Sequence, residues 1–103
     1  MKVKLEFQYF EGCPNHKKMN DNLIEAIKGL EDKIELKKVL IDGEEKANQI
    51  GFRGSPTLLI DGEDIEGIPA PVDPNPSCRF YSNGIPKADE IRKMIFYKIS
   101  KEK

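Results

Sequence analysis

The chain lacks an excess of charge of either sign. Its 103 residues include 17 Lys and Arg side chains against 18 Asp and Glu, for a formal net charge of −1 at pH 7. A chain that binds nucleic acid or an anionic membrane through its charge needs a surplus of basic residues. The balance therefore gives no electrostatic reason to expect either partner.

Long hydrophobic runs are missing as well. No stretch approaches the roughly 20 apolar residues that a membrane-spanning helix needs. The first seven residues, Met1-Lys2-Val3-Lys4-Leu5-Glu6-Phe7, alternate charged and apolar side chains, unlike a signal peptide. We therefore expect a soluble cytoplasmic protein without a membrane segment.

Cysteine is scarce, with two residues far apart at Cys13 and Cys78. Two such cysteines cannot form the dense disulfide framework of a small secreted scaffold. In a reducing compartment, at least one of them is then a reactive thiol or an incidental one. Because cysteine is often buried simply as a small hydrophobic residue, packing alone is the simpler alternative for either.

The length suits a single domain over residues 1–103, since one hydrophobic core commonly serves about 100 to 150 residues. Period-two alternation predicts a strand over Val3–Phe10, which stops at Glu11-Gly12-Cys13-Pro14. From Pro14 the apolar spacing lengthens to about 3.6 residues, which predicts a helix. The apolar stripe of that helix consists of Met19, Leu23, Ile24, Ile27 and Leu30.

The second half of the chain has shorter elements. We expect a strand over Ile34–Ile41, a helix over Glu44–Ile50 that ends at Gly51, and a strand after Gly54-Ser55-Pro56-Thr57. Residues 63–77 contain four prolines and predict an irregular loop, long enough to invite a functional explanation. A last strand is predicted at Arg79-Phe80-Tyr81, before Asn83-Gly84. A helix follows from Pro86, with apolar residues Ile91, Met94, Ile95 and Ile99 and with Lys98, Lys101 and Lys103 near its negative end.

This order, βαβαββα, indicates an α/β domain with a four-stranded mixed sheet flanked by helices on both faces. The two strand–helix–strand crossovers predict parallel neighbours, and the last two strands predict an antiparallel pair.

Two motifs give the chain a resemblance to the thioredoxin superfamily over most of its length. Cys13-Pro14-Asn15-His16 stands where the first strand meets the first helix, and Gly54-Ser55-Pro56-Thr57 opens the third strand. Together with Ser77-Cys78-Arg79-Phe80-Tyr81 after the long loop, they look like the small thioredoxin-like proteins related to those found with alkylmercury lyases. The resemblance implies that Cys13 is the nucleophilic cysteine and that Pro56 follows a cis peptide bond. It also implies that Pro14, Ser55 and Thr57 line a docking groove.

The chain departs from the family pattern at His16, where the second, resolving cysteine of the motif is expected. Unpaired N–H groups and the positive end of the helix dipole favour the Cys13 thiolate, and a protonated His16 three residues later would favour it further. A solvated polar residue remains the alternative reading of His16. We predict a monothiol form of thiol–disulfide chemistry, because a mixed disulfide on Cys13 has no resolving thiol within the motif.

Cys78 is the other thiol that could resolve that mixed disulfide. If residues 58–61 and 79–82 pair as antiparallel strands, Cys78 lies ~12 Å from Pro56 at about 3.3 Å per residue, and we expect a packed residue rather than a partner of Cys13. A bend in the long loop would bring it closer. Cys13, His16, Cys78 and Glu11 could also contribute to a metal site, although structural zinc sites usually take four ligands in two close pairs.

The favoured function is a thiol–disulfide oxidoreductase in which Cys13, His16 and Pro56 carry the chemistry, with no cofactor. Its partners would be proteins or low-molecular-weight thiols and disulfides. Two alternatives stay open, a thioredoxin-like binding module without catalysis and a thiol-based carrier of a metal or organometal.

Overall fold

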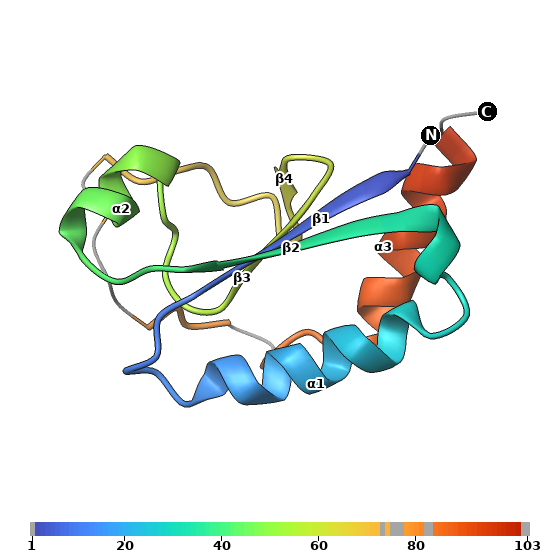
Figure 1. The fold of residues 1–103 in the computed structure, drawn as a ribbon, viewed down its shortest axis with the longest axis horizontal. Coiled ribbons are helices and arrows are strands. Elements are labelled where there is room, and N and C mark those ends of the chain that lie inside the picture. The colour runs from blue at the N-terminus through green and yellow to red at the C-terminus, as the bar shows by residue number, and fades with distance from the viewer. Residues whose placement is uncertain (1, 73, 75–77, 82–83, 102–103) are drawn as a thin grey trace.

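The computed structural model describes residues 2–72, 74, 78–81 and 84–101. The order of elements is β1 (Val3–Tyr9), α1 (Asn15–Ile27), β2 (Ile34–Leu40), α2 (Glu44–Ile50), β3 (Thr57–Ile60), β4 (Glu63–Asp64) and α3 (Ala88–Lys101), with a short 3-10 helix η1 (Glu31–Lys33) before β2. The four strands form one mixed sheet in the order β2-β1-β3-β4 (Figure 1). An α/β fold with a four-stranded mixed sheet is therefore confirmed.

One face of the sheet packs on two helices. Alternation along β1 turns Val3, Leu5 and Phe7 toward α1 and α3, which contact each other; in Figure 1, α1 lies below the sheet and α3 rises at its right-hand end. The buried residues of the helices repeat at helical spacing. This core consists of Met19, Leu23, Ala26, Ile27, Leu30, Ile91 and Ile95, together with Ile34, Leu58 and Ile60 from the other strands. Ile24, predicted in the same stripe, is 40% exposed and lies beside it instead.

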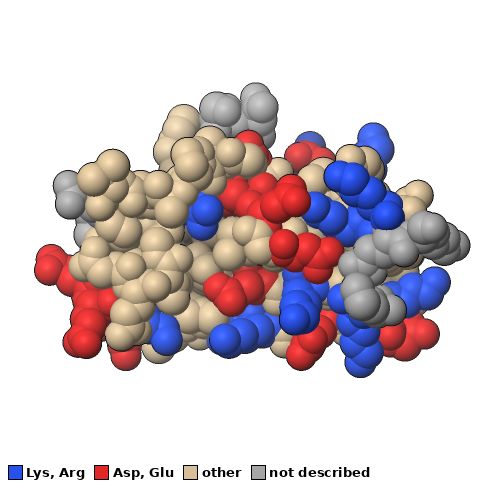
Figure 2. Space-filling view, turned by 90° about the horizontal axis from the view of Figure 1, so that it is seen from above, with Lys and Arg blue, Asp and Glu red and all other residues tan. Residues whose placement is uncertain are grey.

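Among the described residues, a helix covers the opposite face at one end only. Val39 and Ile41, at the carboxyl end of β2, pack with Ala47 of α2 and with Phe52 in a second, smaller cluster. The rest of this face carries charged side chains, and Figure 2, which looks onto it, shows acidic and basic groups interspersed. The expectation of helices on both faces therefore holds for only part of the second face.

The strand directions differ from those predicted at the second crossover. β1 and β2 are parallel, as predicted, but β3 runs antiparallel to β1 and thus to β2. The seven residues of α2 span only about 10 Å, less than the length of β2, so the chain re-enters the sheet near the end at which it left. Gly51 ends α2 in the left-handed conformation, as expected from its place after the helix.

The fourth strand comes from a different segment than predicted. β4 lies within the predicted proline loop and pairs antiparallel with β3 across the Asp61-Gly62 turn. Residues 79–81 form no strand, so that prediction is wrong, and the antiparallel pair at the end of the sheet is β3–β4. The predictions for Ser77, Ser82, Asn83 and Lys103, and for part of the loop at 73 and 75–77, lie outside the described residues.

Candidate functional site

Cys13 lies in the loop that joins β1 to α1, two residues before the helix begins. Its backbone N–H donates to the Phe10 carbonyl oxygen at 3.1 Å, which closes a tight turn after the strand. Its Sγ lies 3.7 Å from the carbonyl oxygen of Ser55, and only 1% of the residue is exposed. The sulfur therefore lies inside the protein, near the positive end of α1.

Ser55 joins the three segments that build this site. Its Oγ accepts the Phe10 N–H at 2.9 Å, which links the β1–α1 loop to the segment before β3. Its carbonyl oxygen accepts the Arg79 N–H at 2.8 Å, and Ser55 and Cys78 form an isolated parallel bridge. The chain before β3 thus contacts both the Cys13 loop and the segment that contains Cys78.

Cys13 and Cys78 are joined by a disulfide, with Cα atoms 5.6 Å apart across 65 residues of sequence. The expectation that Cys78 is a packed residue remote from Pro56 is therefore wrong, and the alternative, in which the chain bends back toward Cys13, is the one observed. The expectation depended on antiparallel pairing of residues 79–82 with β3, whereas the backbone of Arg79 bonds to Ser55 at the beginning of that strand. The structure thus supplies a second cysteine where the local motif has none.

The Ser55–Pro56 peptide bond is cis, which confirms the prediction made from the resemblance. The Pro56 carbonyl accepts the hydroxyl of Tyr81 at 2.5 Å, and Thr57 donates its hydroxyl to the Gly54 carbonyl at 2.6 Å. Ser55 and Thr57 are fully buried, and their side chains bind main-chain groups, while Pro14 is exposed.

A buried ion pair anchors the residue after Cys78. The two terminal nitrogens of Arg79 lie 2.5 and 2.7 Å from the two carboxylate oxygens of Asp64, and one of them also donates to Thr57 at 3.3 Å. Burial works against ionisation of both partners. For Asp64, the effect of burial is outweighed by the hydrogen bonds from Arg79, Ile68 and Glu66 and by the charge of Arg79. The pKa of the Asp64 carboxyl is therefore below its usual range. The pKa of Arg79 is raised.

Two further features fix this segment. A Cβ on Gly54 would lie 2.8 Å from the Cβ of Arg79 and 3.1 Å from its Cα, so only glycine allows this approach of the two chains. The guanidinium of Arg79 lies 4.4 Å from the centroid of the Tyr81 ring. Burial of Tyr81, partly offset by the charge of Arg79, raises the pKa of its hydroxyl above the usual range and keeps it a neutral donor to Pro56.

His16 lies in the first turn of α1. Its ring centroid is 5.1 Å from that of Tyr9, and it lines a surface hollow with Tyr9, Glu11, Asp21 and Lys38, among others. Cys13 does not line this hollow. The imidazole therefore packs against an aromatic ring of β1, while the backbone N–H of His16 lies 3.5 Å from the Cys13 carbonyl oxygen.

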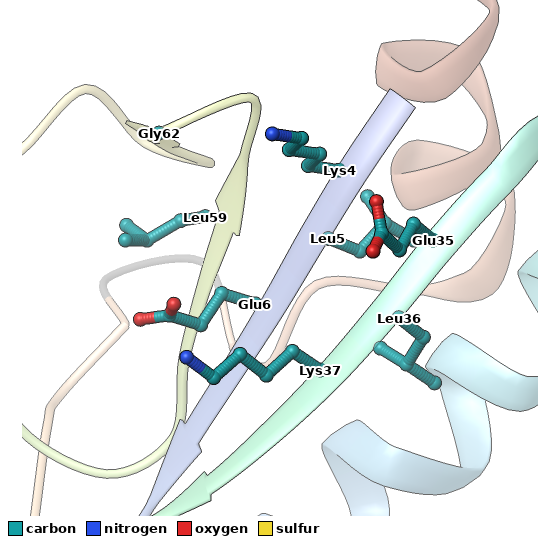
Figure 3. A pocket seen from close by; sticks show the side chains of 8 residues that line it. All are labelled: Lys4, Leu5, Glu6, Glu35, Leu36, Lys37, Leu59 and Gly62. Carbon is teal, nitrogen blue, oxygen red and sulfur yellow. The ribbon is translucent and has the colours of Figure 1, made fainter. Parts of the chain in front are cut away.

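A second hollow, of about 610 Å³, lies on the uncovered face of the sheet. Figure 3 shows the side chains of Lys4, Glu6, Glu35 and Lys37 over the strands, with Leu59 beside them. None of its lining residues is among the site residues predicted from the sequence. In the described part of the chain, no three His, Cys, Asp or Glu side chains are grouped as metal ligands, and no helix is long and apolar enough to cross a bilayer.

Sequence reasoning missed Asp64, and it treated Arg79 and Tyr81 only as residues of a strand. In the structure, exposure alternates along residues 78–81, with Cys78 and Phe80 exposed and Arg79 and Tyr81 buried. A strand-like alternation in this segment was the one signal that the sequence offered. Nothing in the sequence pairs Arg79 with an acidic residue 15 positions earlier. No protein-family model matches the chain, and no curated protein matches it.

Proposed function

We propose that this protein is a thioredoxin-like thiol–disulfide oxidoreductase that cycles Cys13 and Cys78 between the dithiol and the disulfide. The observation that carries the proposal is the pairing of these two residues, with Cα atoms 5.6 Å apart, at the beginning of a helix and beside a cis-proline loop. The α/β sheet, with α1 directly after the Cys13 loop, is compatible with such a fold.

The proposed reaction balances as two thiol–disulfide exchanges. A thiolate of the reduced protein attacks a partner disulfide, forms a mixed disulfide and releases one partner thiolate. The second protein thiolate attacks the protein sulfur of that mixed disulfide and releases the other partner thiolate. Two electrons pass from the Cys13–Cys78 pair to the partner, and a protein dithiol or low-molecular-weight thiol restores the pair.

The second cysteine changes the expected form of this chemistry. His16 replaces the resolving cysteine of the local motif, so the sequence alone favours a monothiol. With Cys78 bonded to Cys13, resolution is intramolecular and has the advantage of a high effective concentration. We expect this chain to act in the cytoplasm. Disulfides of cytoplasmic proteins are usually transient, and they are catalytic or redox-sensing.

The test has two measurements on the full chain. Equilibration with glutathione redox buffers gives the reduction potential of the pair, and a reductase assay with a model aromatic disulfide follows electron transfer. We expect a potential above about −300 mV, since structural disulfides usually lie below that value. Pre-reduced wild-type protein should release both aromatic thiolates without further added thiol, whereas pre-reduced Cys13→Ser and Cys78→Ser should each stop at the mixed disulfide.

A potential below about −300 mV, with no reduction of the model disulfide, would instead favour a structural disulfide in a binding module.

A further inference from the structure

The two sulfurs of the disulfide differ sharply in exposure. Cys13 is 1% exposed, whereas Cys78 is exposed to solvent. Thiol–disulfide exchange requires the incoming thiolate to approach one sulfur along the S–S bond, so access decides which sulfur is attacked. Here the accessible residue is the one that lies outside the Cys-Pro-Asn-His motif.

The backbone around Cys78 explains this exposure. Exposed and buried residues alternate along residues 78–81. Arg79 and Tyr81 point inward, to Asp64 and to the Pro56 carbonyl, so Cys78 and Phe80 are directed outward on the opposite side. The ion pair that anchors this segment therefore also presents Cys78 to solvent.

We infer that Cys78 is the cysteine that exchanges disulfides with external partners and that Cys13 is the buried cysteine that leaves and resolves. This assignment depends on the proposed oxidoreductase function and reverses the roles expected from the motif. It keeps Cys13 as a nucleophilic thiolate, but its target is the sulfur of Cys78 rather than a partner disulfide.

Each step balances in both directions. During reduction of the disulfide, an external thiolate bonds to Sγ of Cys78, the S–S bond breaks, and Cys13 leaves as a thiolate. A second external thiol then releases Cys78 and forms the partner disulfide. In the reverse direction the Cys78 thiolate attacks a partner disulfide, forms a mixed disulfide and releases one partner thiolate. The Cys13 thiolate then attacks Sγ of Cys78 and expels the remaining partner thiolate.

The position of Cys13 suits a leaving group. Exchange is faster when the departing thiol is a stabilised thiolate, and a helix N-terminus provides that stabilisation. Cys13 lies two residues before α1, whose first turn contains no acidic side chain. Cys78, which lies outside any helix, has no such stabilisation and serves as the accessible partner.

The first experiment compares the two single-cysteine variants with 5,5′-dithiobis(2-nitrobenzoate), whose released thiolate absorbs visible light. Under native conditions, Cys78 in the Cys13→Ser variant should react about tenfold or more faster than Cys13 in the Cys78→Ser variant. In guanidinium chloride the two rates should converge, because the difference comes from the fold.

The second experiment uses the oxidised wild-type chain, so it does not depend on either variant folding. A short exposure to glutathione is followed by trapping with methyl methanethiosulfonate and by peptide mapping. Glutathione should be found on Cys78 and the methylthio group on Cys13.

The outcomes separate the two proposals. If the pair reduces the model disulfide but glutathione maps to Cys13, or equally to both cysteines, the assignment of Cys78 is overturned while the oxidoreductase remains. If the wild-type pair transfers no electrons to the model disulfide, both proposals fail.

Discussion

Arg79 and Asp64 form a two-point ion pair inside the protein, with nitrogen–oxygen distances of 2.5 and 2.7 Å. Arg79 directly follows the exposed Cys78, and Asp64 belongs to β4, the shortest strand of the sheet. The pair thus connects the edge of the sheet to the segment that brings Cys78 to Cys13. Its side chains are 6% and 1% exposed, so water does little to compensate the loss of either partner.

Replacing Asp64 with asparagine should lower the free energy of unfolding by about 3 kcal/mol at pH 7, because the Arg79 charge is left buried without its main partner. Urea denaturation of the oxidised protein measures the change. Glu66→Gln is the matched control, since Glu66 faces the same guanidinium at 3.6 Å with a side chain 32% exposed. That variant should lose less than about 1 kcal/mol. Equal losses in the two variants would contradict the role given to the buried pair.

The same carboxyl should make stability depend on pH. The pKa of Asp64 is lowered in the folded protein, so as pH falls the unfolded chain takes up this proton first. The stabilisation is complete above the ordinary aspartate pKa of about 4 and disappears as pH falls through the lower folded value. The difference in free energy of unfolding between wild type and Asp64→Asn should therefore narrow below about pH 4. A difference that stays constant from pH 7 to pH 3 would show that Asp64 does not contribute as a charge.

Tyr81 is buried and its neighbour Phe80 is exposed, so substitutions at these two positions test the orientation of residues 78–81. Tyr81→Phe removes the only hydroxyl that bonds to the Pro56 carbonyl among the described residues, which should cost about 1 to 3 kcal/mol because that oxygen is buried. Phe80 is 88% exposed, so Phe80→Leu should change stability by less than about 0.5 kcal/mol. Thermal and urea unfolding of both variants measure this. A larger loss from Phe80→Leu would mean that the segment faces the other way.

The elements that could be predicted from the sequence are those whose own residues show a hydrophobic repeat or a turn signal at their ends. The helix after Pro14, the strand that begins at Val3 and the helix that ends at Gly51 each have a hydrophobic repeat or a turn residue that marks their limits. The exposure of Ile24 shows the limit of that signal, because the stripe of α1 is narrower than its apolar residues suggest.

The position of Cys78 could not be predicted, because it depends on contacts between segments far apart in sequence. Residues 78–81 alternate like a strand, yet their bonds go to Ser55, Pro56 and Asp64 rather than along a strand partner. A two-residue strand such as β4 is equally hard to find, since it is determined by its turn and by β3. The candidate site was half predictable for this reason: Cys13 and Pro56 lie in local motifs, whereas Cys78, Arg79 and Asp64 meet only in the folded chain.

His16 occupies the position that a resolving cysteine takes in the Cys-x-x-Cys motif. In the wild-type background, His16→Cys should change the rate at which the pre-reduced protein releases both aromatic thiolates by less than about twofold, because Cys13 and Cys78 already resolve the mixed disulfide within the chain. In the Cys78→Ser background the same substitution should let the pre-reduced protein release the second aromatic thiolate from a mixed disulfide on Cys13, since residues three apart at a helix start are neighbours. His16→Ala in both backgrounds is the control for loss of the imidazole, whose ring packs on Tyr9. A large gain in the wild-type background would mean that the Cys13–Cys78 pair does not resolve mixed disulfides. Absence of rescue in the Cys78→Ser background would mean that a thiol at position 16 does not reach Sγ of Cys13.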